Sequence, residues 1–187
     1  MRSLLVISIV LVLSASVFAE SSKKIFTAQN LWYESPIEMS CINFKIGSFL
    51  PAGTEVDSYQ VLNRPFRGGE RTDIYGISFK TTDGDNYFIQ FEERYHPKFE
   101  LEDYANVIFT DKSFSELTNG LTERELYAIK RGILLEGMRK NAVLISYGKP
   151  AEHYTPNIDA DTWYYWTQRN IRKEIYFDED GKTMDVL

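Results

Sequence analysis

The sequence predicts an α+β protein in which a small β-barrel is followed by two short helices and an antiparallel meander of three or four strands. Two observations predict this class. Strand-forming runs alternate with turn signals between positions 30 and 91, whereas two glycine-terminated helical segments and further strand runs follow position 120. The 187 residues suffice for one ordinary domain or two small ones, and the change of pattern favours two.

The first 19 residues, MRSLLVISIVLVLSASVFA, have the pattern of a secretory signal peptide. A positive charge at Arg2 precedes an apolar run, and small residues lead to Ala19. The apolar run of roughly ten residues is half the ~20 that a membrane-spanning helix needs, so we expect no transmembrane segment beyond the signal. The pattern is compatible with cleavage after Ala19 and with retention of the signal.

Cys41 is the single cysteine of the chain. A single cysteine excludes an intramolecular disulfide, and no cysteine directly follows the signal to take a lipid. We therefore expect a periplasmic protein that is peripheral to the outer membrane. No histidine or basic pair lies near Cys41 in the sequence to lower its pKa, which favours a buried structural thiol.

The charge balance argues against a nucleic-acid partner. Without the signal peptide the chain has 20 basic and 27 acidic residues. A nucleic-acid surface needs a concentrated basic stripe, and here the lysines and arginines are scattered among acids.

The first unit is expected at residues 20–110. Its predicted strands lie in the segments NLWYE, MSCINFKI, TEVDSYQVL, DIYGISFK and NYFIQFEE. The segment FLPAGTEVDSYQVLN resembles the opening of a bacterial SH3-like barrel, in which a Pro-x-Gly-Thr turn introduces the strand that holds Val56. A helical spacing of apolar residues predicts a short helix near 99–109, and residues 111–119 are expected to be a linker.

The second unit is expected at residues 120–187 and begins with a helix. Thr122 and Glu125 form a capping box, so the helix starts at Glu123, and Gly132 can adopt the left-handed conformation that ends it.

A second helix is predicted from about Arg139 to Tyr147, because Gly148 can end it and Pro150 prevents its continuation. The segments EHYT, TWYYWTQ, KEIYFD and KTMDVL then predict the antiparallel meander.

Five elements of this second unit resemble the BamE-like (SmpA/OmlA) family of outer-membrane assembly lipoproteins. They are an Ile-x-x-Gly element, a Gly-Met step, an aliphatic helix, a Gly-x-Pro end and a Trp-x-Tyr strand. The matching residues are Ile129 with Gly132, Gly137 with Met138, Val143 with Leu144, Gly148 with Pro150, and Trp163 with Tyr165. The resemblance implies a fold of two helices and a meander, and a place among envelope proteins.

Two departures from the family pattern limit this implication. The family usually has a serine or threonine after Gly-Met to cap the second helix, and this chain has Arg139, so Asn141 or water would have to serve as the cap. The family members of the outer-membrane assembly machine are also lipid-anchored, and the expected mature chain has no N-terminal cysteine.

Residues able to perform catalysis are few. His96 and His153 are the only histidines, and neither has a sequence-local partner for nucleophilic or metal chemistry. The segments DGDN and DEDG lack calcium-loop spacing, and Gly68-Gly69 precedes no helix that could hold a phosphate. We therefore predict no enzyme and no cofactor or metal site, unless His153, Asp159 and Asp161 converge in a pocket.

The strand TWYYWTQ is the predicted binding element. Because side chains alternate along a strand, Trp163 and Tyr165 share one face, and the resemblance assigns this face to the interior. Tyr164 and Trp166 then face outward as candidate protein-binding residues. The alternative is that contact between the two units buries both faces.

These features together predict a non-enzymatic envelope protein that binds other proteins, with an accessory or scaffold role in outer-membrane assembly or maintenance. The alternative is a proteinaceous inhibitor of a secreted hydrolase, because β-lactamase inhibitor proteins share this helix-helix-sheet arrangement, as the resemblance implies.

Overall fold

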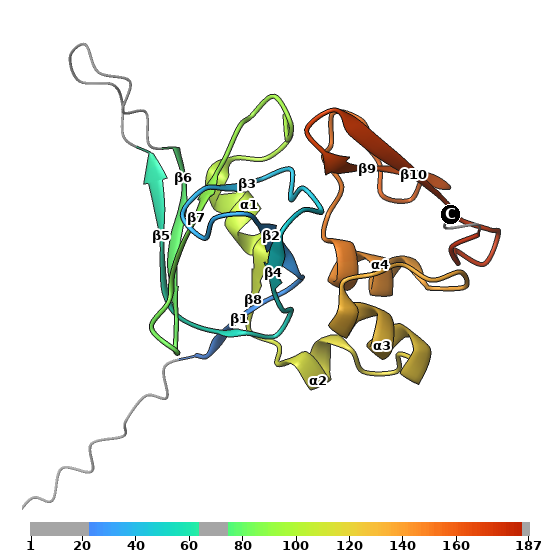
Figure 1. The fold of residues 1–187 in the computed structure, drawn as a ribbon, viewed down its shortest axis with the longest axis horizontal. Coiled ribbons are helices and arrows are strands. Elements are labelled where there is room, and N and C mark those ends of the chain that lie inside the picture. The colour runs from blue at the N-terminus through green and yellow to red at the C-terminus, as the bar shows by residue number, and fades with distance from the viewer. Residues whose placement is uncertain (1–22, 64–74, 185–187) are drawn as a thin grey trace, which may run out of the picture.

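The computed structural model describes residues 23–63 and 75–184, which form a mixed α+β protein (Figure 1). The predicted signal peptide and Gly68-Gly69 lie outside the described residues. Four helices are present in this part of the chain. Figure 1 shows a curled sheet on one side. On the other side lie the helices α3 (Glu123–Arg131) and α4 (Lys140–Tyr147) with the hairpin of β9 (Thr162–Gln168) and β10 (Ile171–Tyr176).

Six strands form the curled sheet, which makes half a barrel. Their order is β3-β7-β6-β5-β1-β8, and only the β3–β7 pair is parallel. The strands are β1 (Ile25–Thr27), β3 (Met39–Ser40), β5 (Glu55–Asn63), β6 (Tyr75–Thr81), β7 (Asn86–Gln90) and β8 (Phe109–Thr110).

The buried centre of this sheet consists of apolar residues at alternate positions of β6 and β7. Ile77 and Phe79 of β6 are buried, and they pair with Ile89 and Tyr87 of β7. A Cβ added to Gly76 would lie 2.1 Å from the carbonyl oxygen of Ile89, so this close approach of two strands requires glycine. The acidic segment DGDN is the turn between β6 and β7, as its composition predicts.

The predicted run MSCINFKI gives only the two-residue strand β3, because the chain turns directly afterwards. Asn43 in this turn has φ 56°, in the left-handed region that asparagine tolerates better than most residues. Two further short strands, β2 (Leu31–Tyr33) and β4 (Ser48–Leu50), pair with each other beside the main sheet. The short strands β1, β4 and β8 have no clear alternation in the sequence and were not predicted.

Helix α1 (Leu101–Ile108) lies within the predicted helical stretch and packs on the sheet. Residues 111–119 were expected to be a linker, but they contain the short helix α2 (Phe114–Leu117). Ser113 and Glu116 close a capping box on α2, a signal present in the sequence that the linker interpretation overlooked.

Helix α3 (Glu123–Arg131) starts and ends as predicted. Thr122 and Glu125 form its capping box, and Gly132 ends it in the left-handed conformation with φ 62°. A Cβ at Gly132 would also lie 2.6 Å from the ring of Trp32, so this glycine allows the two halves of the chain to approach. Helix α4 (Lys140–Tyr147) follows, with Arg139 at the N-cap position.

The described residues show only part of the predicted meander. After α4, as far as position 184, they form one hairpin, β9 (Thr162–Gln168) with β10 (Ile171–Tyr176). The segment EHYT forms a turn whose backbone bonds return to Ala151, and KTMDVL contributes isolated bridges at Lys182 and Thr183 within its described residues.

Buried amide side chains join the two halves. The Asn30 side chain accepts a hydrogen bond from the Ala52 N–H (2.8 Å) and donates to the carbonyl oxygens of Ile129 (2.8 Å) and Ser146 (3.1 Å). The Asn43 side chain donates to the carbonyl oxygen of Tyr147. These bonds connect the start of the chain with α3 and α4, so the relative placement of the halves depends on satisfied buried polar groups.

Candidate functional site

The aromatic residues of β9 lie alternately on the two faces of the hairpin β9–β10. Trp163 and Tyr165 are 1% and 2% exposed and pack with α3 and α4 in one apolar core. Tyr164 and Trp166 are half-buried, so the predicted outward pair is neither freely exposed nor enclosed by the other half of the chain.

Tyr154, from the loop before β9, explains this intermediate burial. Its ring centroid lies 5.8 Å from that of Trp166 and 6.3 Å from that of Tyr164. Arg172 of β10 pairs in register with Trp166, and its guanidinium carbon lies 4.1 Å from the Tyr154 ring centroid and 5.5 Å from that of Trp166. We call Tyr154, Tyr164, Trp166 and Arg172 the aromatic face.

The aromatic face combines apolar area with a positive charge. Tyr154 is 41% exposed, and Arg172 is also exposed. Within residues 23–63 and 75–184 no carboxylate forms an ion pair with Arg172. A rigid aromatic group with an available guanidinium can accept a ligand that presents an apolar side chain beside a carboxylate. Sequence reasoning identified Tyr164 and Trp166 but missed Tyr154 and Arg172, although the strand register could have placed Arg172 opposite Trp166.

His153 lies under the aromatic face. Its ring stacks on Trp166 with an interplanar angle of 7° and contacts Tyr95. Burial lowers the pKa of His153, which favours the neutral ring near pH 7. Neither His153 Nδ1 nor Trp166 Nε1 has a hydrogen-bond partner in the described structure.

The residues that could have indicated an enzyme are not brought together. The contacts of His153 are aromatic, whereas Asp159 and Asp161 are exposed and lie near Lys140, which donates to the Asp159 carbonyl oxygen. His96 is fully buried, and its Nε2 lies 3.2 Å from the carbonyl oxygen of Cys41. Burial lowers the pKa of His96.

The other residues that carry the family resemblance form turns or lie in the interior. Gly137 and Gly148 both have φ 80°, in the left-handed half of conformational space, and Met138 and Pro150 are buried. Lys45, from the first half, donates from its Nζ to the Tyr147 carbonyl oxygen at 2.5 Å and so gives a hydrogen bond to the C-terminal end of α4. Burial holds the pKa of Lys45 well below its usual value.

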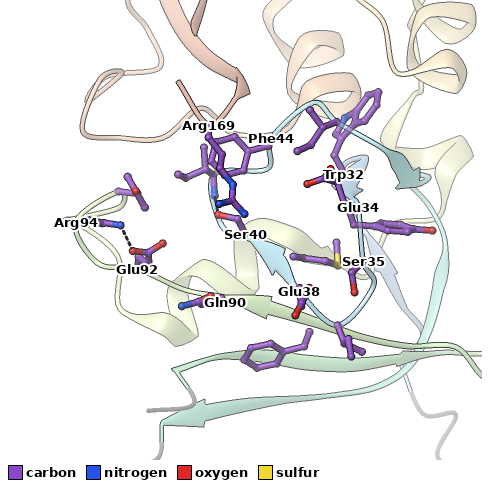
Figure 2. A pocket seen from close by; sticks show the side chains of 17 residues that line it. Trp32, Glu34, Ser35, Glu38, Ser40, Phe44, Gln90, Glu92, Arg94 and Arg169 are labelled. Atoms are coloured by element: carbon purple, nitrogen blue, oxygen red, sulfur yellow. Dashed lines mark hydrogen bonds and ion pairs between the residues drawn. The ribbon is translucent and has the colours of Figure 1, made fainter. Parts of the chain in front are cut away.

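A cleft of about 590 Å³ opens beside this hairpin (Figure 2). Its walls come from the β2–β3 loop, the segment after β3, the end of β7 and Arg169 in the β9–β10 turn. Sequence reasoning missed the cleft entirely, because its walls lie in separate parts of the chain and their residue types form no motif.

Comparison of the chain with protein-family models, with curated proteins and with solved structures gives no match. In the described ranges no group of three or more His, Cys, Asp or Glu side chains could hold a metal ion. None of the helices described here has the length and apolar character required to cross a bilayer.

Proposed function

We propose that this chain is a non-enzymatic protein of the bacterial envelope that binds another protein through its aromatic face. The observation behind the proposal is the packing of Tyr154, Trp166 and Arg172 into one partly exposed group. Large aromatic residues and arginine supply much of the binding energy in protein interfaces. Aromatic rings offer a large contact area at a small entropic cost, and the guanidinium can form two parallel hydrogen bonds with a carboxylate. The expected partner presents an apolar side chain next to a carboxylate.

The proposed context is outer-membrane assembly or maintenance, with an N-terminal SH3-like unit and a C-terminal BamE-like unit. The signal-peptide pattern and the family resemblance support this context. The packing of α3 and α4 on Trp163 and Tyr165 is compatible with the second assignment. The proposed role is that of a periplasmic accessory protein or scaffold.

Site-specific photocrosslinking tests the proposal. A photoreactive amino acid at Tyr154 should capture a specific partner in intact cells, and Arg172→Ala should remove most of that product. The pair Tyr127 and Arg131 provides a matched control, because its guanidinium carbon lies 5.8 Å from an exposed ring on α3, away from the hairpin. A photoreactive group at Tyr127 should not capture the same partner.

The identity of the captured protein separates the two functions. Barrel-assembly components would support the accessory role, whereas a secreted hydrolase would support the inhibitor. Equal capture from Tyr154 and Tyr127, or none from Tyr154, would refute binding through the aromatic face.

A further inference from the structure

The cleft beside the hairpin has charges of opposite sign on its walls. Figure 2 shows Glu34 on one side and the Arg94–Glu92 pair on the other, with Arg169 and Phe44 at the rim. Glu38 also lines the cleft, on the same loop as Glu34. The first half of the chain supplies the acidic wall, and the β9–β10 turn supplies Arg169.

Arg169 is the available cation of this cleft. Arg94 Nη2 lies 2.5 Å from the Glu92 carboxylate, so the charge of Arg94 is already compensated. Across the described residues Arg169 has no ion pair or hydrogen bond through its side chain, and the same holds for Glu34 and Glu38. These three exposed groups can each accept a ligand group of opposite charge without breaking an existing pair.

The acidic wall is held in place by backbone hydrogen bonds. The Pro36 carbonyl oxygen accepts from the Phe88 N–H of β7 at 2.9 Å, and the Ser35 carbonyl oxygen accepts from the Glu38 N–H at 3.1 Å. On the other side, the Lys45 N–H donates to the Trp166 carbonyl oxygen at 3.4 Å and ties the hairpin to the segment after β3. Little ordering is therefore required of either wall on binding, which limits the entropic cost.

Between the walls the lining mixes apolar and polar groups. Ile42 and Phe88 lie among the lining residues together with Ser40 and Gln90. A volume of about 590 Å³ lies within the range of small-ligand sites and suits a peptide of a few residues. Three carboxylates against two guanidiniums make the lining unfavourable for a polyanion such as a nucleotide.

We propose that this cleft binds a short extended peptide segment that has an acidic residue at one end and a basic residue at the other. The peptide carboxylate pairs with Arg169, the ammonium group pairs with Glu34 and Glu38, and the intervening residues lie over Ile42 and Phe88. This site is separate from the aromatic face and does not depend on its function.

Calorimetric titration with defined peptides tests the proposal. The probes are blocked peptides in which a lysine and an aspartate are separated by one to four alanines. At least one spacing should bind, and Arg169→Ala should weaken its binding about tenfold, because it removes a charge-assisted pair with the peptide carboxylate. Replacing the peptide aspartate by asparagine should produce the same loss and make the peptide insensitive to Arg169→Ala.

Arg172→Ala is the matched control, since it removes an arginine from the same hairpin outside the lining of the cleft. It should leave peptide affinity unchanged while removing crosslinking at the aromatic face. Glu34→Gln combined with Glu38→Gln should weaken the lysine peptide but not its norleucine analogue. Absence of binding at millimolar peptide for every spacing, or equal losses in the two arginine variants, would overturn the proposal.

Discussion

The Arg139 guanidinium donates two hydrogen bonds to the carboxylate of Glu125, with Nη2 2.6 Å from one oxygen and Nε 2.9 Å from the other. The backbone N–H of Arg139 also donates to Glu125, at 3.0 Å. Glu125 is therefore both the capping-box residue of α3 and the acceptor for the residue that precedes α4. Arg139 has no capping side chain of its own, and this contact accounts for an arginine at that position.

We expect Glu125→Gln to lower the free energy of unfolding by about 1–2 kcal/mol, because it removes the charge of the acceptor for Arg139, whose own side chain is 39% exposed and can be solvated. Urea denaturation measured by circular dichroism gives this value. The matched control is Glu116→Gln, which alters the exposed capping box of α2. An equal loss in both variants would show that the pair with Arg139 contributes little.

The Glu125 carboxylate should also make the stability of the protein depend on pH. The hydrogen bond from Arg139 lowers the pKa of Glu125 from 4.5 to about 2. A carboxyl with a depressed pKa in the folded state stabilises the protein above its unfolded value of 4.5, and this stabilisation is lost as the pH falls from 4.5 to about 2. The difference in stability between the native sequence and Glu125→Gln should shrink over this window. A constant difference across it would contradict the assignment.

Asn30→Ala should be strongly destabilising although it removes only a small polar side chain. It leaves the Ala52 N–H and the carbonyl oxygens of Ile129 and Ser146 without this partner in a buried region. A loss of about 3 kcal/mol follows from a cost of roughly 1–3 kcal/mol for each buried group left unsatisfied. Asn119→Ala, at an exposed position, is the control and should change stability little. Thermal unfolding compares the two variants.

The two tryptophans of β9 should differ in their effect on stability. Trp163→Ala should cost about 4 kcal/mol, because it creates a cavity in the core beneath α3 and α4. Trp166→Ala should cost clearly less, since its ring is only half-buried and its Nε1 has no hydrogen bond to lose among the described residues. Chemical denaturation of both variants tests this order, and equal losses would argue that Trp166 serves the core and not a binding surface.

Cys41 should behave as an unreactive thiol. It is 1% exposed, the Glu92 N–H donates to its Sγ, and burial raises the pKa of the thiol to about 12. Since only the thiolate reacts, an aromatic disulfide reagent at pH 8 should modify native Cys41 on the order of a thousandfold more slowly than the urea-unfolded chain. Similar rates in both states would contradict the structural role.

Local chemistry predicted the parts of the fold that depend on neighbours in the sequence. The limits of α3 follow from Thr122, Glu125 and Gly132, because hydrogen bonds at helix ends involve residues three or four positions apart. Alternation placed Trp163 and Tyr165 on one face of β9, and that face is buried, as the family resemblance implied. The strand predicted at EHYT is a turn, and the part of KTMDVL that the structure describes forms isolated bridges at Lys182 and Thr183 and no strand, although both segments have strand-like composition.

The sequence by itself therefore determined the mixed α+β class, the ends of α3 and the two faces of the aromatic strand. Only the tertiary structure decided that Arg139 pairs with Glu125, that Tyr154 and Arg172 cover Trp166, and that Arg169 shares a cleft with Glu34. The physical reason is the sequence distance over which each interaction acts. Backbone propensity and capping act over a few residues, whereas these groups lie between 6 and 135 positions apart. Those of the second half meet through the hairpin and the packing of its helices and loops, and Arg169 meets Glu34 through the packing of the two halves.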